Sequence, residues 1–238
     1  MNGKICHQYR RRIEKEVEEV DKISEIKENL VPLKQTKVVR VPVKFVSPFI
    51  LEYEYLGTMP GWSEFAFAQY FKNLVGGVLL FGHTTGSDKA FTKMFKNEKV
   101  LQLQRGVNFW WTPKNSASYF ISKTCRWLKD NTDYNIITAT CDEEAGEVGT
   151  IYQALNWSYI GAPKHGHPVF LIDEKSIHPK TLYDRHGTSA VGKIKEIYGE
   201  RVEIVKRTFK HRYAIRLNGK QIESLPYIKR KSRFEAIS

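Results

Sequence analysis

A strand pattern that runs into an amphipathic helix constrains the fold of this chain most. Residues 100–106 alternate apolar and polar side chains, as a half-buried strand does. A polar loop follows, and the apolar residues of segment 117–129 then recur at helical spacing on one face. Residues 135–141 return to a strand pattern. The order strand, helix, strand predicts a mixed α/β sheet with a helix packed on it.

Further elements surround this unit, and a chain of 238 residues can bury one sizeable core. Residue type predicts strands over 38–46, 65–70, 74–83, 157–160, 169–172, 202–205 and 213–217, and spacing or capping predicts helices over 13–30, 48–56, 88–96, 149–155 and 189–198. We expect an N-terminal amphipathic helix within 1–37, a catalytic core over 38–175, and a basic C-terminal segment over 176–238 that packs on the core.

The net charge of +12 is concentrated near the carboxyl end. Between Val205 and Arg233 ten basic residues accompany one acid, Glu223. The ten are Lys206, Arg207, Lys210, Arg212, Arg216, Lys220, Lys229, Arg230, Lys231 and Arg233. Such a concentration suits a polyanion-binding surface, because each cation placed on a phosphate releases counterions. A basic, solvated tail is the alternative.

Nothing in the sequence indicates a membrane protein. The longest apolar run, 74–82, is far shorter than the roughly 20 residues that a membrane helix needs. The basic amino terminus lacks the apolar stretch of a signal peptide. Cys6, Cys125 and Cys141 are irregularly spaced, which favours reduced thiols over a disulfide framework. We therefore expect a cytoplasmic protein without a membrane partner.

A metal site is a second possibility that the sequence raises. His165 and His167, which flank a glycine, lie near His178 in sequence and could be joined by Cys141. The two close histidines stand in a loop without regular ligand spacing. We predict no metal site from this pattern, and a metal requirement stays open.

The loop before the helix 117–129 is a candidate anion site. A helix N-terminus presents unpaired amides and the positive end of the helix dipole. Asn115 or Ser116 is the natural N-cap, and these residues and Ser118 can cap the helix, bind an anion, or do both. Residues 112–118 are thus the first candidate for contact with a phosphate-bearing ligand.

A set of short motifs then carries a family resemblance. They are Tyr55-Leu56-Gly57, Phe81-Gly82-His83, Arg105, Asn115-Ser116 with Ser118, Asp142, and Gly149-Thr150-Ile151-Tyr152. Together with the element order, they resemble the GNAT-like acyltransferase fold and, more closely, the phage Mom family. The set spans residues 53–161, and its specificity lies in order and spacing.

The resemblance implies an enzyme that modifies double-stranded DNA. It implies addition of a small acyl-derived (carbamoylmethyl) group to the exocyclic amine of adenine, which protects phage DNA from restriction in the cytoplasm of the bacterial host. This chain departs from the family pattern at Glu54, where relatives often have histidine. It also lacks the Gln/Arg-x-x-Gly-x-Gly/Ala loop of acetyl-CoA enzymes, since residues 112–118 read Thr-Pro-Lys-Asn-Ser-Ala-Ser. Because this loop is absent, the donor stays open between acetyl-CoA and another acyl carrier.

The resemblance and the chemistry of the side chains together assign roles to individual residues. The catalytic candidates are Asp142, Tyr152 and His83; the donor-binding candidates are Arg105, Asn115, Ser116 and Ser118; and the nucleic-acid candidates are Trp110, Trp111, Lys206, Arg207, Lys210 and Arg212. A carboxylate that follows a strand can reach a cleft as a base, and histidine titrates near neutral pH. Arginine can neutralise a phosphate, and tryptophan can stack on a displaced base.

Each of these residues also has a structural interpretation. Asp142 can be a turn former, Tyr152 a core residue, and His83 a half-exposed polar residue at a strand end. Arg105 can pair with a buried carboxylate, and the two tryptophans can close the core. Two other functions stay open as well: an acyltransferase acting on a protein, an amino acid or aminoacyl-tRNA, and a non-catalytic DNA-binding protein. The oligomeric state is not indicated.

Overall fold

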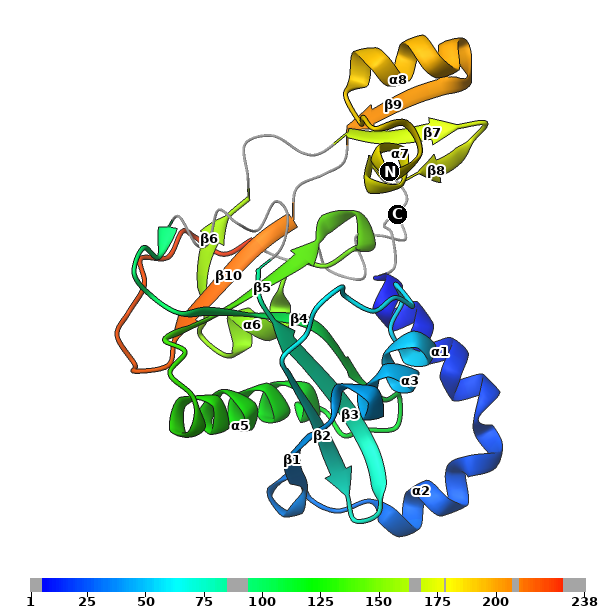
Figure 1. Cartoon of the computed structure of the whole chain (residues 1–238). Coiled ribbons are helices and arrows are strands. Elements are labelled where there is room, and N and C mark those ends of the chain that lie inside the picture. Colours follow the sequence, from blue (N-terminus) through cyan, green and yellow to red (C-terminus); the bar gives the residue numbers. More distant parts are fainter. Residues whose placement is uncertain (1–5, 85–93, 163–167, 178, 207–209, 229–238) are drawn as a thin grey trace.

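The computed structural model describes residues 6–84, 94–162, 168–177, 179–206 and 210–228. These residues form a seven-stranded sheet in the order β1-β2-β3-β4-β5-β10-β6 and a three-stranded sheet in the order β8-β7-β9 (Figure 1). The strands are β1 (Lys37–Val41), β2 (Phe65–Phe71), β3 (Leu74–Gly82), β4 (Val100–Asn108), β5 (Ile136–Asp142), β6 (Ser158–Gly161), β7 (Pro168–Ile172), β8 (Lys175–Ile177), β9 (Val202–Lys206) and β10 (Lys210–Arg216).

Helices cover both faces of the larger sheet. The helices of the described residues are α1 (His7–Glu18), α2 (Ile23–Asn29), α3 (Val43–Tyr53), α5 (Ser116–Asn131), α6 (Thr150–Ala154), α7 (Pro179–His186) and α8 (Val191–Tyr198), with short 3-10 turns between some of them. None of the helices in the described part of the chain is long and apolar enough to cross a membrane. The predicted helix over 88–96 lies mostly outside the described residues.

One parallel pair sits within an otherwise antiparallel sheet. β4 and β5 run parallel and pair only from Val100–Leu103 to Ile136–Ala139. β4 then continues to Asn108 beside β3, and β5 continues to Asp142 beside β10. The two strands therefore part and leave an opening between their carboxyl ends. This arrangement confirms the mixed α/β class that the sequence predicts.

Alternation along the strands builds a core on each face of the sheet. In β2, Phe65 and Phe67 point to the face that α5 covers, whereas Ala66 and Ala68 point to the face that α3 covers. Phe120 and Leu128 of α5 join the first core and are fully buried. The helix predicted over 117–129 is thus confirmed, with its apolar face against the sheet.

The helix α3 begins earlier than the sequence pattern predicts. Pro42 ends β1, the helix starts at Val43, and Pro48 lies inside it rather than at its first turn. Val46, Ile50 and Tyr53 fall on one helical face and are buried, so burial of that face outweighs the backbone hydrogen bond that Pro48 cannot donate.

The N-terminal helix docks through polar side chains. Its apolar residues Ile13 and Val17 are 44% and 72% exposed. Arg11 instead donates to the carbonyl of Glu52, and Glu19 accepts hydrogen bonds from the Tyr53 hydroxyl and the Trp110 indole. A 3-10 turn at Val20–Lys22 separates α1 from α2, which divides the helix predicted over 13–30.

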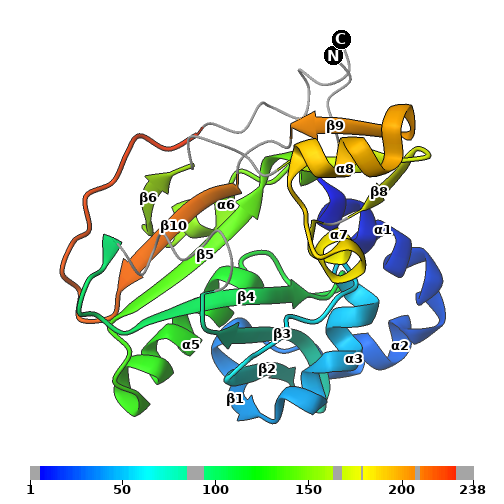
Figure 2. The same cartoon turned by 45° about the horizontal axis from the view of Figure 1, so that its top comes forward.

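A smaller unit is inserted between β6 and β10. The strands β7, β8 and β9 carry α7 and α8, and Phe170, Leu182 and Ile194 form a separate buried core there. Figures 1 and 2 show this unit beside the main sheet. The predicted C-terminal segment, 176–238, thereby contributes β9 to the small sheet and β10 to the main one.

The turn into α6 requires glycine, and this requirement can be tested. Gly149 has φ +73°, and a Cβ there would lie 2.2 Å from Cε2 of Tyr213. Left-handed backbone costs about 1–2 kcal/mol and overpacking about 1–3 kcal/mol, so we expect Gly149→Ala to lower the free energy of unfolding by about 3 kcal/mol in urea.

The matched control is Gly187→Ala. Gly187 has a similar φ of +69°, but a Cβ there meets nothing within 4 Å. Only the backbone cost of about 1–2 kcal/mol is therefore expected at this position. Equal losses at the two glycines would show that the Tyr213 contact does not matter.

Candidate active site

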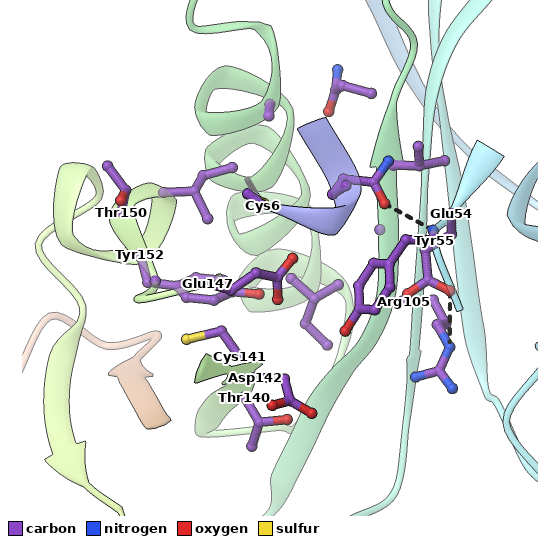
Figure 3. A pocket seen from close by; sticks show the side chains of 18 of the residues that line it. Cys6, Glu54, Tyr55, Arg105, Thr140, Cys141, Asp142, Glu147, Thr150 and Tyr152 are labelled. Carbon is purple, nitrogen blue, oxygen red and sulfur yellow. Dashed lines mark hydrogen bonds and ion pairs between the residues drawn. The ribbon is translucent and has the colours of Figure 1, made fainter. Parts of the chain in front are cut away.

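A cavity of about 430 Å³ opens where β4 and β5 part. Its floor and walls come from the ends of both strands, the loop 146–149, the first turns of α5 and α6, the segment after α3, and α1. Its polar and titratable lining residues are Cys6, Gln8, Tyr9, Arg12, Glu54, Tyr55, Gln104, Arg105, Asn108, Thr140, Cys141, Asp142, Glu147, Thr150, Tyr152 and Lys210. Figure 3 shows many of these side chains directed into the cavity.

One wall holds a buried carboxyl group next to an arginine. Glu54, the residue after α3, is 8% exposed, and its Oε2 lies 3.5 Å from Nε of Arg105. Burial raises the pKa of Glu54 to about 7, although the charge of Arg105 partly opposes this. Arg105 also donates to the carbonyl of Thr58 at 3.0 Å and to that of Gln104 at 2.8 Å. The arginine thus fixes the segment after α3 against β4.

The neighbouring Tyr55 extends the same wall. Its ring lies edge-on to His7, with centroids 5.6 Å apart, and its backbone amide donates to the side chain of Gln8. Burial and the charge of Glu147 raise the pKa of the Tyr55 phenol. Figure 3 shows Tyr55 and Glu147 reaching into the cavity from opposite sides. At neutral pH this tyrosine is therefore a hydrogen-bond donor.

The opposite wall carries Asp142, Glu147 and Tyr152. Asp142 ends β5, and a short turn brings the Glu147 amide back to donate to the Asp142 carbonyl at 3.0 Å. Burial raises the pKa of Glu147 to about 7, and the charge of Asp142 adds to this rise. The arrangement places two carboxyl groups, coupled through their charges, in one wall of the cavity, where they can accept protons.

Tyr152 stands on α6 among other aromatic rings. It lies 5.1 Å from Trp157 and 5.3 Å from Tyr213, measured between ring centroids. Burial raises the pKa of Tyr152 well above its usual value. The phenol consequently stays protonated at neutral pH and can act as a proton donor. The structure brings together Asp142, Tyr152 and Arg105 of the residues that the sequence singled out.

The other predicted donor-binding residues lie beside the cavity. Asn115 has φ +67° and makes no side-chain cap, and Ser118 donates to its carbonyl. The Ser116 hydroxyl turns into the core, where it bonds Gln69. The residue between the serines, Ala117, lines the cavity, so the first turn of α5 opens on it. Binding of a donor by these residues stays a prediction.

His83 and the two predicted tryptophans also lie outside the cavity lining. The His83 side chain is 50% exposed, with Nε2 3.5 Å from Oε2 of Glu64. The Trp110 indole donates to Glu19, and Trp111 packs edge-on against Phe71. Their proposed roles in proton transfer and base stacking stay predictions.

The basic candidates divide between the two sheets. Lys210 lines the cavity and pairs in register with Asp142, and Arg212 lies two residues further along β10. Lys206 ends β9, whereas Arg207 lies outside the described residues, as do His165, His167 and His178. Within the described ranges no group of three or more His, Cys, Asp or Glu side chains could hold a metal ion.

Sequence reasoning noted Glu54 only as a departure from the family pattern, and it missed Glu147 and the contribution of α1. Gln8 and Arg12 of α1 line the cavity, and Arg12 donates to the carbonyls of Phe109 and Trp110. Glu147 lies two residues before Gly149, which begins one of the family motifs. This closeness in sequence was the signal that could have pointed to Glu147. No pattern in the sequence shows that α1 packs next to Tyr55.

Comparison with known proteins places this geometry in context. A model of the Mom protein family matches residues 35–232, which confirms the resemblance seen in the sequence. No curated protein matches the chain. The family match leaves α1 outside it, although that helix supplies part of the cavity.

Solved structures with a similar arrangement are acyltransferases. FeeM, an N-acyl amino acid synthase from uncultured soil microbes, shares 12% identity over 77% of this chain and 92% of its own, with a TM-score of 0.44. NAA60 from Arabidopsis thaliana in complex with acetyl-CoA shares 6% sequence identity over 78% of this chain and 100% of its own, with a TM-score of 0.47. An N-acetyltransferase from Staphylococcus aureus Mu50 shares 9% sequence identity over 77% of this chain and 99% of its own, with a TM-score of 0.42.

The two buried carboxyl groups predict a pH-dependent stability. Glu54 and Glu147 have folded-state pKa values of about 7, above the usual value of about 4.3 in an unfolded chain. Between these values the folded protein binds more protons, so stability falls as pH rises and levels off above pH 7. Each group contributes a fall of up to about 1.4 kcal/mol per pH unit. Urea unfolding at a series of pH values measures this slope.

Replacement by glutamine tests the assignment. Glu54→Gln and Glu147→Gln should each make the fall shallower, because each removes one titrating group. Glu174→Gln, at an exposed position, is the matched control and should leave the slope unchanged. An identical slope in the wild type and the double variant would refute the assignment.

Proposed function

This chain belongs to the Mom protein family, and on that premise we propose that it is a transferase that modifies adenine in DNA. The group transferred is small and acyl-derived, a carbamoylmethyl group, and it is added to the exocyclic amine of adenine. The observation that carries this proposal is the cavity between β4 and β5, which collects proton-accepting and proton-donating side chains around one space. Modified adenine would protect phage DNA from restriction in the bacterial cytoplasm.

The acid and base groups divide the chemical work. The exocyclic amine of adenine is a poor nucleophile, so its attack needs a group that takes its proton. Asp142 is that group in this proposal, and Glu147 lies beside it at the same end of β5. Tyr152, whose phenol burial keeps protonated, gives a proton to the departing group. The adenine nitrogen thus loses one proton to Asp142 as its bond to the transferred group forms. The departing group gains one proton from Tyr152 as its bond to that group breaks.

The donor site is the first turn of α5 together with Arg105. Ala117 and Ile121 of this helix line the cavity, so its amino-terminal amides and positive dipole end face a phosphate-bearing donor. Asn115, Ser116 and Ser118 shape that turn. Arg105, on β4, adds a cation to the cavity lining. The donor, acetyl-CoA or another acyl carrier, presents the group on a carbon bonded to the carrier: the adenine nitrogen bonds that carbon, and the bond to the carrier breaks. Acetyl-CoA itself would transfer an acetyl group, whereas a carbamoylmethyl group needs a carrier that holds it through its methylene carbon.

Basic residues supply the contact with double-stranded DNA. Lys210 lies at the cavity itself, and Arg212 follows on the same strand. The excess of cations after residue 205 extends this field, and the net charge of the chain is +12. Contacts from lysine and arginine to phosphates position a protein on DNA without reading its sequence.

The test is the nucleoside composition of DNA from cells that express the protein. Digestion and mass spectrometry should reveal an adenine nucleoside of increased mass. Asp142→Asn and Tyr152→Phe should each lower its amount by about 100-fold, since a positioned acid or base contributes about that factor or more. Asp130→Asn and Tyr183→Phe, at exposed positions away from the cavity, are the matched controls and should have no effect.

Other outcomes would contradict the proposal. Absence of any modified adenine in the wild type removes DNA adenine as the target. Transfer to a free amine without DNA favours an acyltransferase that acts on a protein, an amino acid or aminoacyl-tRNA. Full modification by a folded Asp142→Asn, Tyr152→Phe double variant excludes the acid and base roles.

A further inference from the structure

Trp62 is the most exposed large aromatic side chain in the described part of the chain. It is 65% exposed, on the loop that joins α3 to β2. This loop begins with Tyr55 and Leu56, which line the cavity. An indole ring exposed in this way offers a flat face on which a planar group can stack.

The backbone around Trp62 is held in place by residues of β3 and β4. Gln104, which lines the cavity, donates to the carbonyls of Trp62 at 2.9 Å and of His83 at 3.1 Å. The Ser63 hydroxyl donates to the Gln104 side chain at 2.8 Å. A Cβ at Gly82 would lie 2.6 Å from the Trp62 carbonyl, so this glycine permits the close approach. These contacts fix the backbone of Trp62 next to a residue that lines the cavity.

The aromatic neighbour of the Trp62 ring is polar. His83 meets Trp62 edge-to-face, with centroids 5.4 Å apart, and Glu64 and Ser63 lie next to it in sequence. A protein interface needs an apolar centre and about 800 Å² on each partner. A single flat ring among polar groups instead matches a nucleobase, which stacks on one aromatic face and meets water or polar groups at its edges.

We propose that Trp62 stacks on an unpaired nucleobase at the mouth of the cavity. An enzyme that acts on the pairing edge of a base must take that base out of the duplex, and the strand around it then exposes unstacked bases. The Trp62 ring holds one of these bases beside the cavity, because Gln104, which lines the cavity, also bonds the Trp62 backbone. The choice of DNA as ligand rests on the proposed function.

Binding of two oligonucleotides without any donor tests this role. One is a labelled single strand of about ten deoxyadenosines, and the other has the same length and phosphates but abasic sites. Fluorescence anisotropy should show that Trp62→Ala weakens binding of the first by about tenfold and leaves binding of the second unchanged. Trp62→Phe should keep most of the affinity, because it retains a ring. Tyr183→Ala, which removes an aromatic side chain 59% exposed on α7, should change neither affinity.

Several results would overturn the inference. Equal affinity of wild type and Trp62→Ala for the deoxyadenosine strand would do so, as would equal losses for both oligonucleotides. A change in molar mass of Trp62→Ala in light scattering would assign the ring to a contact between copies of the chain instead. These results are separate from those that decide the proposed function: a wild type that binds the strand through Trp62 but modifies no adenine would reject the proposed reaction alone.

Discussion

The parting of β4 and β5 is the constraint on which the rest of the site depends. After four residue pairs, each strand keeps its outer neighbour, β3 or β10, and loses its inner one. The inner edges then face a space that neither strand can fill with its own backbone. Side chains from the segment after α3, from α1 and from the loop 146–149 line that space.

The electrostatics of the cavity follow from its enclosure. Glu54 and Glu147 lose water on folding, and both carboxyl groups therefore titrate near pH 7 instead of near pH 4. Arg105 keeps Glu54 from a still higher value. A cavity with groups of this kind can take up and release protons under conditions in which duplex DNA is intact. This property suits a reaction that removes a proton from a weakly basic amine.

Local patterns predicted the fold well, and contacts between distant segments explain what they left out. The alternation in β4, the apolar face of α5 and the motif around Gly149 each depend on neighbours in sequence, so they indicated the strand, the helix and one wall of the cavity. The burial of Glu54 depends instead on the docking of α1 and on Arg105, which lies 51 positions later in the chain. Among the tryptophans, residue type alone cannot tell that Glu19 pairs with Trp110 while Trp62 stays exposed.

The insertion between β6 and β10 has a consequence for how the protein is made. β10 lies between β5 and β6 in the main sheet, yet the whole of the smaller unit precedes it in the chain. During synthesis, the edges of β5 and β6 that pair with β10 therefore stay unpaired until β10 has left the ribosome. Pairings between strands this distant in sequence form slowly. Because β10 also brings Lys210 to Asp142, the cavity is complete only after β10 has paired with β5.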